Sequence, residues 1–171
     1  MKGSHPPYDP HGFRYAVRGI GRALVGERNL RFQLTAALYL LYGMRFYEQA
    51  ELSRGERAVL LLCIGLVLAF EMMNTAVEYA VDLTSPRRAP LAGWAKDAAA
   101  AAVLVIALVG VAVGLLLLWN PAVFARMLDY HLARPSRLAI LLLTLPLAWM
   151  WVYRGPGGRR DHEKTEEKDD R

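Results

Sequence analysis

The sequence Glu71-Met-Met-Asn-Thr-Ala-Val-Glu-Tyr-Ala-Val-Asp82 directly follows an apolar run, Ala58 to Phe70. At about 100° per residue, four of its polar residues fall within roughly 80° of one another on a helix, namely Glu71, Asn74, Glu78 and Asp82. A helix over Ala58–Leu83 would be about 39 Å long, enough to span a bilayer core of roughly 30 Å. The stretch therefore predicts a transmembrane helix whose polar stripe begins inside the membrane.

Carboxylates inside a bilayer are costly, at about 2.5–3.5 kcal/mol for an acidic residue near the centre on insertion scales. Such a stripe is expected only where it faces a protein interior that holds cations. It therefore indicates function. On the residues alone, two alternatives stay open: the stripe forms hydrogen bonds that hold an assembly of helices together, or it lines an ion path.

The composition favours one helical membrane domain, because 54% of the 171 residues are hydrophobic and occur in long runs. One cysteine excludes an intrachain disulfide, and the four histidines show no metal-ligand spacing. No glycine-rich nucleotide motif of a soluble fold is present. The N-terminus lacks the pattern of a cleavable signal peptide, and we expect no nucleic-acid partner.

The chain before the stripe predicts two helices after a disordered lead, 1–12. From Phe13 to Gly26 an apolar face alternates with a basic one that carries Arg14, Arg18 and Arg22, as in an amphipathic helix on the membrane surface. A solvated cap helix is the alternative. A first transmembrane helix is expected from about Asn29 to Phe46, followed by a polar loop up to Arg57.

After the stripe, the pattern predicts a loop over Thr84–Ala95 and a third transmembrane helix that opens at Lys96 and ends near Trp119. A connector over 120–136 leads to a further apolar segment, Arg137–Tyr153. The distribution of Lys and Arg favours a fourth crossing with both termini in the cytoplasm, while a surface or re-entrant helix is the alternative. The tail, 154–171, is expected to be disordered.

The predicted topology brings carboxylates and cations together at the cytoplasmic interface, where ATP is available. Phosphoryl transfer needs carboxylates that hold a divalent metal on the phosphates, cations that neutralise charge, and a base for the attacking hydroxyl. The residue types for all three tasks are present at this interface. The sequence is therefore compatible with a kinase whose acceptor lies in the membrane.

Several motifs resemble the small integral membrane lipid kinases of bacteria, the prokaryotic diacylglycerol kinase and undecaprenol kinase family. They are Glu71-x-x-Asn74-Thr75-Ala76-x-Glu78-x-x-x-Asp82, Pro90-Leu91-Ala92, Ala95-Lys96-Asp97, Phe13-x-Tyr15-Ala16-x-x-Gly19 and Glu27-Arg28-Asn29-x-Arg31. The resemblance covers about Phe13 to Trp119, so 13–119 is taken as the kinase domain and 120–153 as an addition. It implies an all-α integral membrane fold with three core spans, a homotrimer, and sites between subunits.

The resemblance also implies roles for individual residues. Glu71 would be the catalytic base, helped by Asn74, and Glu27 and Glu78 would hold Mg²⁺ on ATP. The nucleotide would also be contacted by Lys96 and Asp97, with Tyr15 and Arg87 nearby, while Arg31 and Asp82 would support the site. Gln33 departs from the family pattern as we interpret it, which has a histidine or a glutamate there.

From these motifs we expect an ATP- and Mg²⁺-dependent lipid kinase of the bacterial cytoplasmic membrane. The Glu27-Arg28-Asn29 stretch and the loop around Pro90 look more like the undecaprenol kinase branch, so undecaprenol is the expected acceptor. Diacylglycerol is the alternative acceptor. From another functional class, the alternative is a non-catalytic membrane assembly or channel protein.

Overall fold

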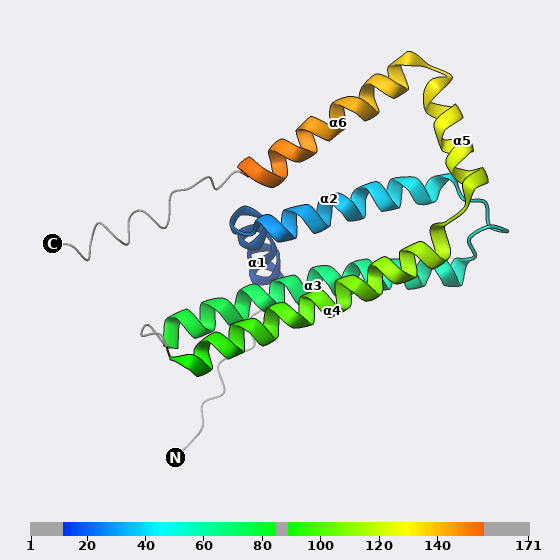
Figure 1. The fold of residues 1–171 in the computed structure, drawn as a ribbon. Helices are drawn as coiled ribbons and strands as arrows, with labels where there is room; N and C mark the ends of the chain where they lie inside the picture. The colour runs from blue at the N-terminus through cyan, green and yellow to red at the C-terminus, as the bar shows by residue number, and fades with distance from the viewer. Residues whose placement is uncertain (1–11, 85–88, 156–171) are drawn as a thin grey trace.

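The structure is a computed structural model that describes residues 12–84 and 89–155, and every element in these ranges is helical. Figure 1 shows them in chain order: α1 (Gly12–Gly26), α2 (Arg28–Gly43), the short η1 (Met44–Phe46), α3 (Arg54–Thr84), α4 (Pro90–Leu118), α5 (Pro121–Leu132) and α6 (Pro135–Arg154). The expected all-α fold is confirmed. The lead before Gly12, the tail after Gly155 and Arg87 lie outside the described residues.

The long helices α3 and α4 form an antiparallel hairpin, with α2 beside it (Figure 1). The expected start of α3 at Ala58 was four residues late. The Ser53 backbone N–H donates to Glu56 Oε2 at 2.7 Å, and the Glu56 N–H donates to Ser53 Oγ at 3.3 Å. This capping box satisfies two otherwise unpaired donors and lets the helix begin at Arg54.

The boundary expected for the next helix was also wrong, because α4 begins at Pro90 rather than at Lys96. Proline is favoured in the first helical turn, since it has no N–H to leave unpaired. Lys96 and Asp97 therefore lie two turns inside α4 rather than at its start.

Within the described ranges, three helices are long and apolar enough to cross a membrane: α3, α4 and α6. This result agrees with the expected second, third and fourth crossings. With 16 residues, α2 is about 24 Å long and falls short of a bilayer core of roughly 30 Å. Its crossing of the membrane stays a prediction.

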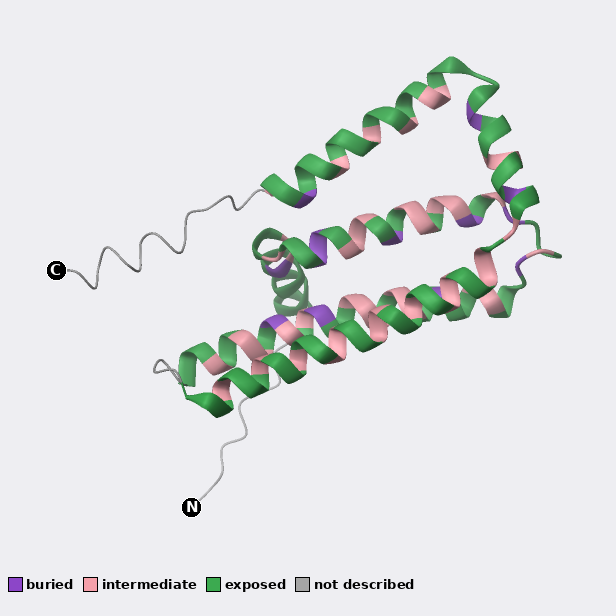
Figure 2. Ribbon diagram, in the orientation of Figure 1, coloured by how far each residue is buried: buried purple, intermediate pink, exposed green. Residues whose placement is uncertain are grey.

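The surface supports a membrane environment. Figure 2 shows green, exposed residues along most of α4 and α6, and no residue of α4 is buried within the chain. Exposed leucine and valine side chains along α4 would be unfavourable in water but match lipid tails or another protein surface. The single chain thus leaves its most apolar helix exposed, for lipid or another protein surface to cover.

The region expected to be a connector, 120–136, contains a helix, α5. The Asn120 side chain accepts hydrogen bonds from the N–H groups of Ala122 and Val123, at 3.1 and 3.4 Å, and Pro121 occupies the first helical position. Both features start a helix where weak amphipathicity had suggested only a link. In α6, Pro146 lies inside a continuous helix, as membrane helices tolerate.

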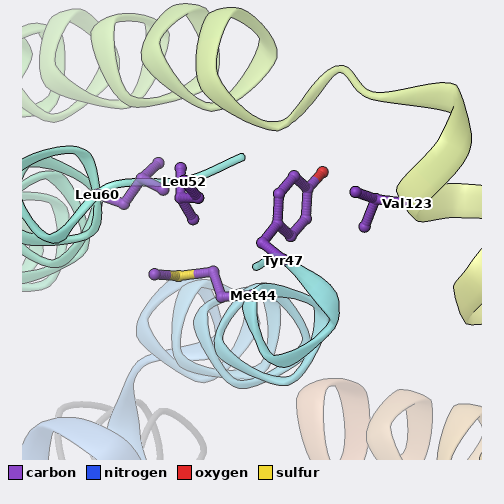
Figure 3. Close-up of a cluster of buried hydrophobic side chains, with 5 residues drawn as sticks. All are labelled: Met44, Tyr47, Leu52, Leu60 and Val123. Carbon is purple, nitrogen blue, oxygen red and sulfur yellow. The ribbon is translucent and has the colours of Figure 1, made fainter. Parts of the chain in front are cut away.

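A small apolar core closes one end of the bundle. Figure 3 shows its five side chains: Met44, Tyr47, Leu52, Leu60 and Val123. They come from η1, the following loop, and the starts of α3 and α5, and the Tyr47 hydroxyl donates to the carbonyl of Leu118. The core therefore fixes the α2–α3 loop against the end of α4.

Arg57 holds the same loop from the other side. Its guanidinium donates to three backbone carbonyls: Leu52 at 3.1 Å, Met44 at 3.1 Å and Tyr47 at 2.7 Å. One side chain thereby satisfies carbonyls on both sides of the turn, which has no regular secondary structure of its own after Phe46.

We expect Arg57→Ala to destabilise the protein by about 2–3 kcal/mol, because three half-buried carbonyls lose their donor. Thermal unfolding in detergent, followed by circular dichroism, would show a lower midpoint. Arg54→Ala is the matched control, since Arg54 is exposed at the start of the same helix. Equal midpoints for Arg57→Ala and wild type would contradict this role.

Arg31 joins three helices at the opposite end of α2. Its buried guanidinium donates to the carbonyls of Leu24 (3.1 Å) and Val25 (2.8 Å) in the last turn of α1, and to Val152 of α6 through Nε and Nη2 (3.3 and 3.1 Å). Helix ends leave carbonyls unpaired, and a charged donor satisfies them well. Arg31 thus attaches both α1 and the added helix α6 to the start of α2.

Gly155 ends α6 at φ +44° directly against this guanidinium. A Cβ at Gly155 would lie 2.6 Å from Arg31 Cζ. We expect Gly155→Ala to lower stability by about 1–3 kcal/mol, because both the backbone angle and the arginine would have to adjust.

The measurement is again the thermal midpoint in detergent. Gly43→Ala is the control, because a Cβ at Gly43, the last residue of α2, meets nothing within 4 Å. If Gly155→Ala and Gly43→Ala both have the thermal midpoint of wild type, the contact between Arg31 and Gly155 does not fix α6.

Candidate active site

The polar stripe lies along the C-terminal half of α3. Glu71 is buried, with only 4% of its surface exposed, whereas Asn74 and Glu78 are half-buried and Asp82 is exposed enough to meet solvent. At 1.5 Å per residue, Glu71 lies about 10 Å deeper along α3 than Glu78. The stripe therefore runs from a buried end at Glu71, called the dry end below, to a solvent-exposed end at Asp82, called the wet end.

The Glu71 carboxylate has a hydrogen-bond donor on another helix. Gln33 Nε2 of α2 donates to Glu71 Oε2 at 2.9 Å. A buried carboxylate needs such a partner, because it loses its hydration. Gln33 faces α3 because it lies on the same side of α2 as the buried residues Leu30 and Ala37, three residues before it and four after it.

One turn further along α3, Asn74 Nδ2 donates to Glu78 Oε1 at 2.7 Å. Asn74 Oδ1 and Gln33 Oε1 are both buried and have no hydrogen-bond partner in the described part of the chain. Buried acceptors normally find a donor. Each of these two oxygens could therefore accept a hydrogen bond from a bound ligand.

Glu27 precedes α2 and lies near the same carboxylates. Its partial burial raises the pKa of the Glu27 carboxyl above the usual value, and the negative charges of Glu78 and Glu71 raise this pKa further, while Arg31 acts in the opposite direction. Carboxylates that repel one another in this way gain from a bound cation. Glu27 and Glu78 therefore form an electrostatically suitable place for a divalent metal.

Within residues 12–84 and 89–155, no group of three or more His, Cys, Asp and Glu side chains is close enough to hold a metal by itself. Mg²⁺ does not require such a group in a nucleotide site, since it keeps waters and is bound by one or two carboxylates together with phosphate oxygens. The carboxylates of Glu27 and Glu78 would suit Mg²⁺ that arrives bound to ATP.

The wet end of the stripe pairs with α4. Lys96 Nζ donates to Asp82 Oδ1 at 2.5 Å, across the α3–α4 hairpin. Asp97, the next residue, is exposed. A lysine that is paired with a carboxylate in this way can still contact a phosphate group, and Asp82 holds the lysine in position.

The remaining predicted residues lie elsewhere. Tyr15 is 56% exposed on α1, and the guanidinium of Arg18 lies 5.7 Å from the centre of its ring. Within the described residues, Arg31 donates hydrogen bonds only to backbone carbonyls, while its charge acts on the Glu27 carboxyl without a direct hydrogen bond. The structure thus brings Glu71, Asn74, Glu78 and Glu27 near one another and pairs Asp82 with Lys96, while the side-chain contact seen for Tyr15 is with Arg18.

Two contacts were not anticipated from the sequence. Gln33 was noted only as a departure from a family pattern, and its bond to Glu71 was not expected. Thr75 donates its hydroxyl to the Glu71 backbone carbonyl at 3.1 Å and is itself buried. The signal in the sequence was a polar residue, Gln33, on the face of α2 that also carries Leu30, Ala37 and Leu40.

Comparison with known proteins gives one family. The model of the prokaryotic diacylglycerol kinase family matches residues 14–118. Undecaprenol kinase of Bacillus subtilis (strain 168) is 42% identical over 106 residues, which make up 61% of this chain and 83% of the relative. Diacylglycerol kinase of Synechocystis sp. is 40% identical over 113 residues, 64% of this chain and 61% of the relative. Diacylglycerol kinase of Pseudomonas aeruginosa is 38% identical over 88 residues, which make up 52% of this chain and 69% of the relative.

The family match covers α1 to α4 and ends at the last residue of α4, so α5 and α6 lie outside it. It includes each described residue of the polar stripe, together with Glu27, Gln33 and Lys96. Because it accounts for more than half of the chain, the chain belongs to the prokaryotic diacylglycerol kinase family and is a multi-pass membrane lipid kinase that uses ATP.

Proposed function

We propose that the chain transfers the γ-phosphate of ATP to undecaprenol, with diacylglycerol as the alternative acceptor. The observation that carries the proposal is an apolar groove whose lining includes Gln33, the residue that donates to the buried Glu71 carboxylate. The groove has a volume of about 340 Å³ and lies between α2, α3 and α4.

The lining of this groove supports a polyprenol. Beyond Gln33 it is formed by apolar side chains of the three helices, together with Cys63 and the backbone of Gly110 and Gly114. An undecaprenol molecule has one polar group, at its end, whereas a diacylglycerol carries two esters near its hydroxyl. Apart from Gln33, the side chains of the groove offer those esters no donor of N–H or O–H type. The 42% identical undecaprenol kinase supports the same acceptor.

The proposed reaction assigns each residue a task. The acceptor hydroxyl oxygen attacks the γ-phosphorus, the bond to the β–γ bridging oxygen breaks, and ADP leaves with the electron pair. Glu71 takes the hydroxyl proton. Asn74 helps by donating its amide N–H to Glu78, which holds the polar side chains beside the base in place. A base inside the membrane can reach a lipid hydroxyl that does not leave the bilayer.

The nucleotide is proposed to bind at the wet end of the stripe. Mg²⁺, held by Glu27 and Glu78, would neutralise charge on the phosphates. Lys96 and Asp97 contact the nucleotide, Tyr15 and Arg87 lie near it, and Arg31 and Asp82 hold the surrounding helices and Lys96 in place. The protein is proposed to act as a homotrimer in the bacterial cytoplasmic membrane, with both termini in the cytoplasm.

Glu71→Gln tests the base. We expect phosphate transfer to undecaprenol to fall by at least about a hundred-fold, because the amide cannot take a proton. The measurement is transfer of labelled γ-phosphate by the purified protein in lipid micelles with Mg²⁺, with undecaprenol and diacylglycerol offered separately.

Glu56→Gln is the matched control on the same helix, since glutamine preserves the capping box at the start of α3. The control should keep wild-type transfer, and both variants should keep the wild-type oligomer on size-exclusion chromatography. A faster reaction with diacylglycerol would contradict undecaprenol as the preferred acceptor. Full activity of Glu71→Gln would contradict Glu71 as the catalytic base.

Gln33→Leu tests whether the hydrogen bond positions the base. Without the donor at 2.9 Å, the carboxylate can rotate away from the hydroxyl, so we expect kcat to fall about ten-fold. The KM for MgATP should stay unchanged, because Gln33 lies toward the dry end of the stripe. Gln49→Leu, in the exposed loop after η1, is the control. A rise in KM for MgATP with constant kcat would contradict the role.

A further inference from the structure

A second apolar groove lies between α2 and the added helix α6. It has a volume of about 540 Å³ and is separate from the groove beside Glu71. Leu34, Leu38 and Tyr42 line it from α2, and Ile140, Leu147 and Trp151 line it from α6. The family match ends before α5, so this groove exists because of the part of the chain that the match does not cover.

Polar contacts hold the walls of the groove together. The Tyr39 hydroxyl donates to Thr144 Oγ1 at 2.9 Å, and the Tyr42 hydroxyl forms a hydrogen bond with His131 Nε2 at 2.9 Å. His131 is buried, and its Nδ1 lies 2.7 Å from the carbonyl oxygen of Met127. These polar atoms are thus already engaged with each other, and what remains open to a ligand is mostly apolar surface.

Among the described residues, Arg137 is the only Lys, Arg, Asp or Glu that lines the groove, and it lies at the end beside α5. Nη1 donates to the Tyr130 carbonyl at 3.1 Å, and the guanidinium lies 4.0 Å from the centre of the Tyr130 ring. In the described part of the chain no carboxylate forms an ion pair with it, and the first turn of α6 holds no acidic residue. Its Nε and Nη2 groups therefore remain available to an anion with paired oxygens.

The dimensions fit a lipid chain. From Arg137 to Trp151 the groove follows α6 for about 21 Å, which is most of a hydrocarbon core of roughly 30 Å. If α6 crosses the bilayer, its first turn places Arg137 near one membrane surface, and the last turn, held by Arg31, lies near the other. A molecule in the groove would have an apolar chain in the membrane and a charged group at the α5 end.

We propose that this groove binds one anionic phospholipid of the bilayer, with an acyl chain between α2 and α6 and the phosphate on Arg137. The two grooves contact different faces of α2, since Leu34 and Leu38 line this one and Gln33 and Ala37 the other. Moreover, Arg137 lies at the end of the bundle away from the α3–α4 turn and Lys96 (Figure 1). The bound lipid is therefore a neighbour of the enzyme and not its acceptor, and the proposal does not depend on the acceptor assigned above.

The test is native mass spectrometry of the full chain released from nanodiscs of phosphatidylglycerol or of phosphatidylcholine with the same acyl chains. We expect wild type to retain one phosphatidylglycerol per chain and about ten-fold less phosphatidylcholine. Arg137→Gln should lower retention of phosphatidylglycerol about ten-fold, since the guanidinium supplies the charged hydrogen bonds. Arg134→Gln is the matched control, because Arg134 is exposed, directly precedes α6 and does not line the groove.

A second variant tests the apolar wall. Ala148→Phe places a ring in the groove while Arg137 stays, so it should also lower retention of phosphatidylglycerol. Size-exclusion chromatography would check that each variant stays folded. Equal retention of phosphatidylglycerol by Arg137→Gln and wild type would overturn the proposal, as would equal losses in Arg137→Gln and Arg134→Gln. If a polyprenol copurified with the protein in place of a phospholipid, the proposed phospholipid occupant would be wrong, and the groove would be an acceptor site.

Discussion

The hydrogen bond between Gln33 and Glu71 joins two polar groups on which this part of the membrane domain depends. A carboxylate on an apolar helix has lost its water, so it needs a donor from the protein. No neighbour on α3 donates to it in the described structure, and the donor comes from α2. The short helix α2 must therefore lie against α3 at Gln33, and the positions of Glu27 before it and of the apolar groove below it follow from that contact.

A neutral donor at this position has a chemical consequence. An acidic residue in place of Gln33 would set two carboxyl groups side by side, and a proton or a cation would have to be shared between them. The amide donates to the Glu71 carboxylate without adding charge, so this carboxylate, which we propose as the base, stays available for a proton from a hydroxyl group. The same amide keeps its own carbonyl oxygen unpaired and buried. That oxygen could accept a hydrogen bond from a bound ligand.

The sequence predicted those parts of the fold that depend on local pattern. Long apolar runs predicted α3, α4 and α6, and the break after Gly26 agrees with the structure. Capping was less easily recognised: the box of Ser53 and Glu56 lengthens α3, Pro90 starts α4 early, and Asn120 turns an expected connector into α5. These errors share a cause, because hydrophobic periodicity says little about polar residues at a helix end, whose side chains decide where the helix begins.

The site was predictable in so far as it lies on one helix. The spacing of Glu71, Asn74 and Glu78 fixes a common face on α3 whatever surrounds it. The contact of Gln33 with Glu71 and the bonds of Arg31 to Val152 join residues 38 and 121 positions apart, and no local pattern records such a pairing. Both contacts come from α2, whose opposite faces separate the groove at Glu71 from the groove at Arg137. Turning a helix by one residue rotates its face by about 100°, so adjacent residues such as Gln33 and Leu34 can serve different grooves. In this chain a helix of 16 residues thus holds the Glu71 side chain on one side and receives the added helix α6 on the other.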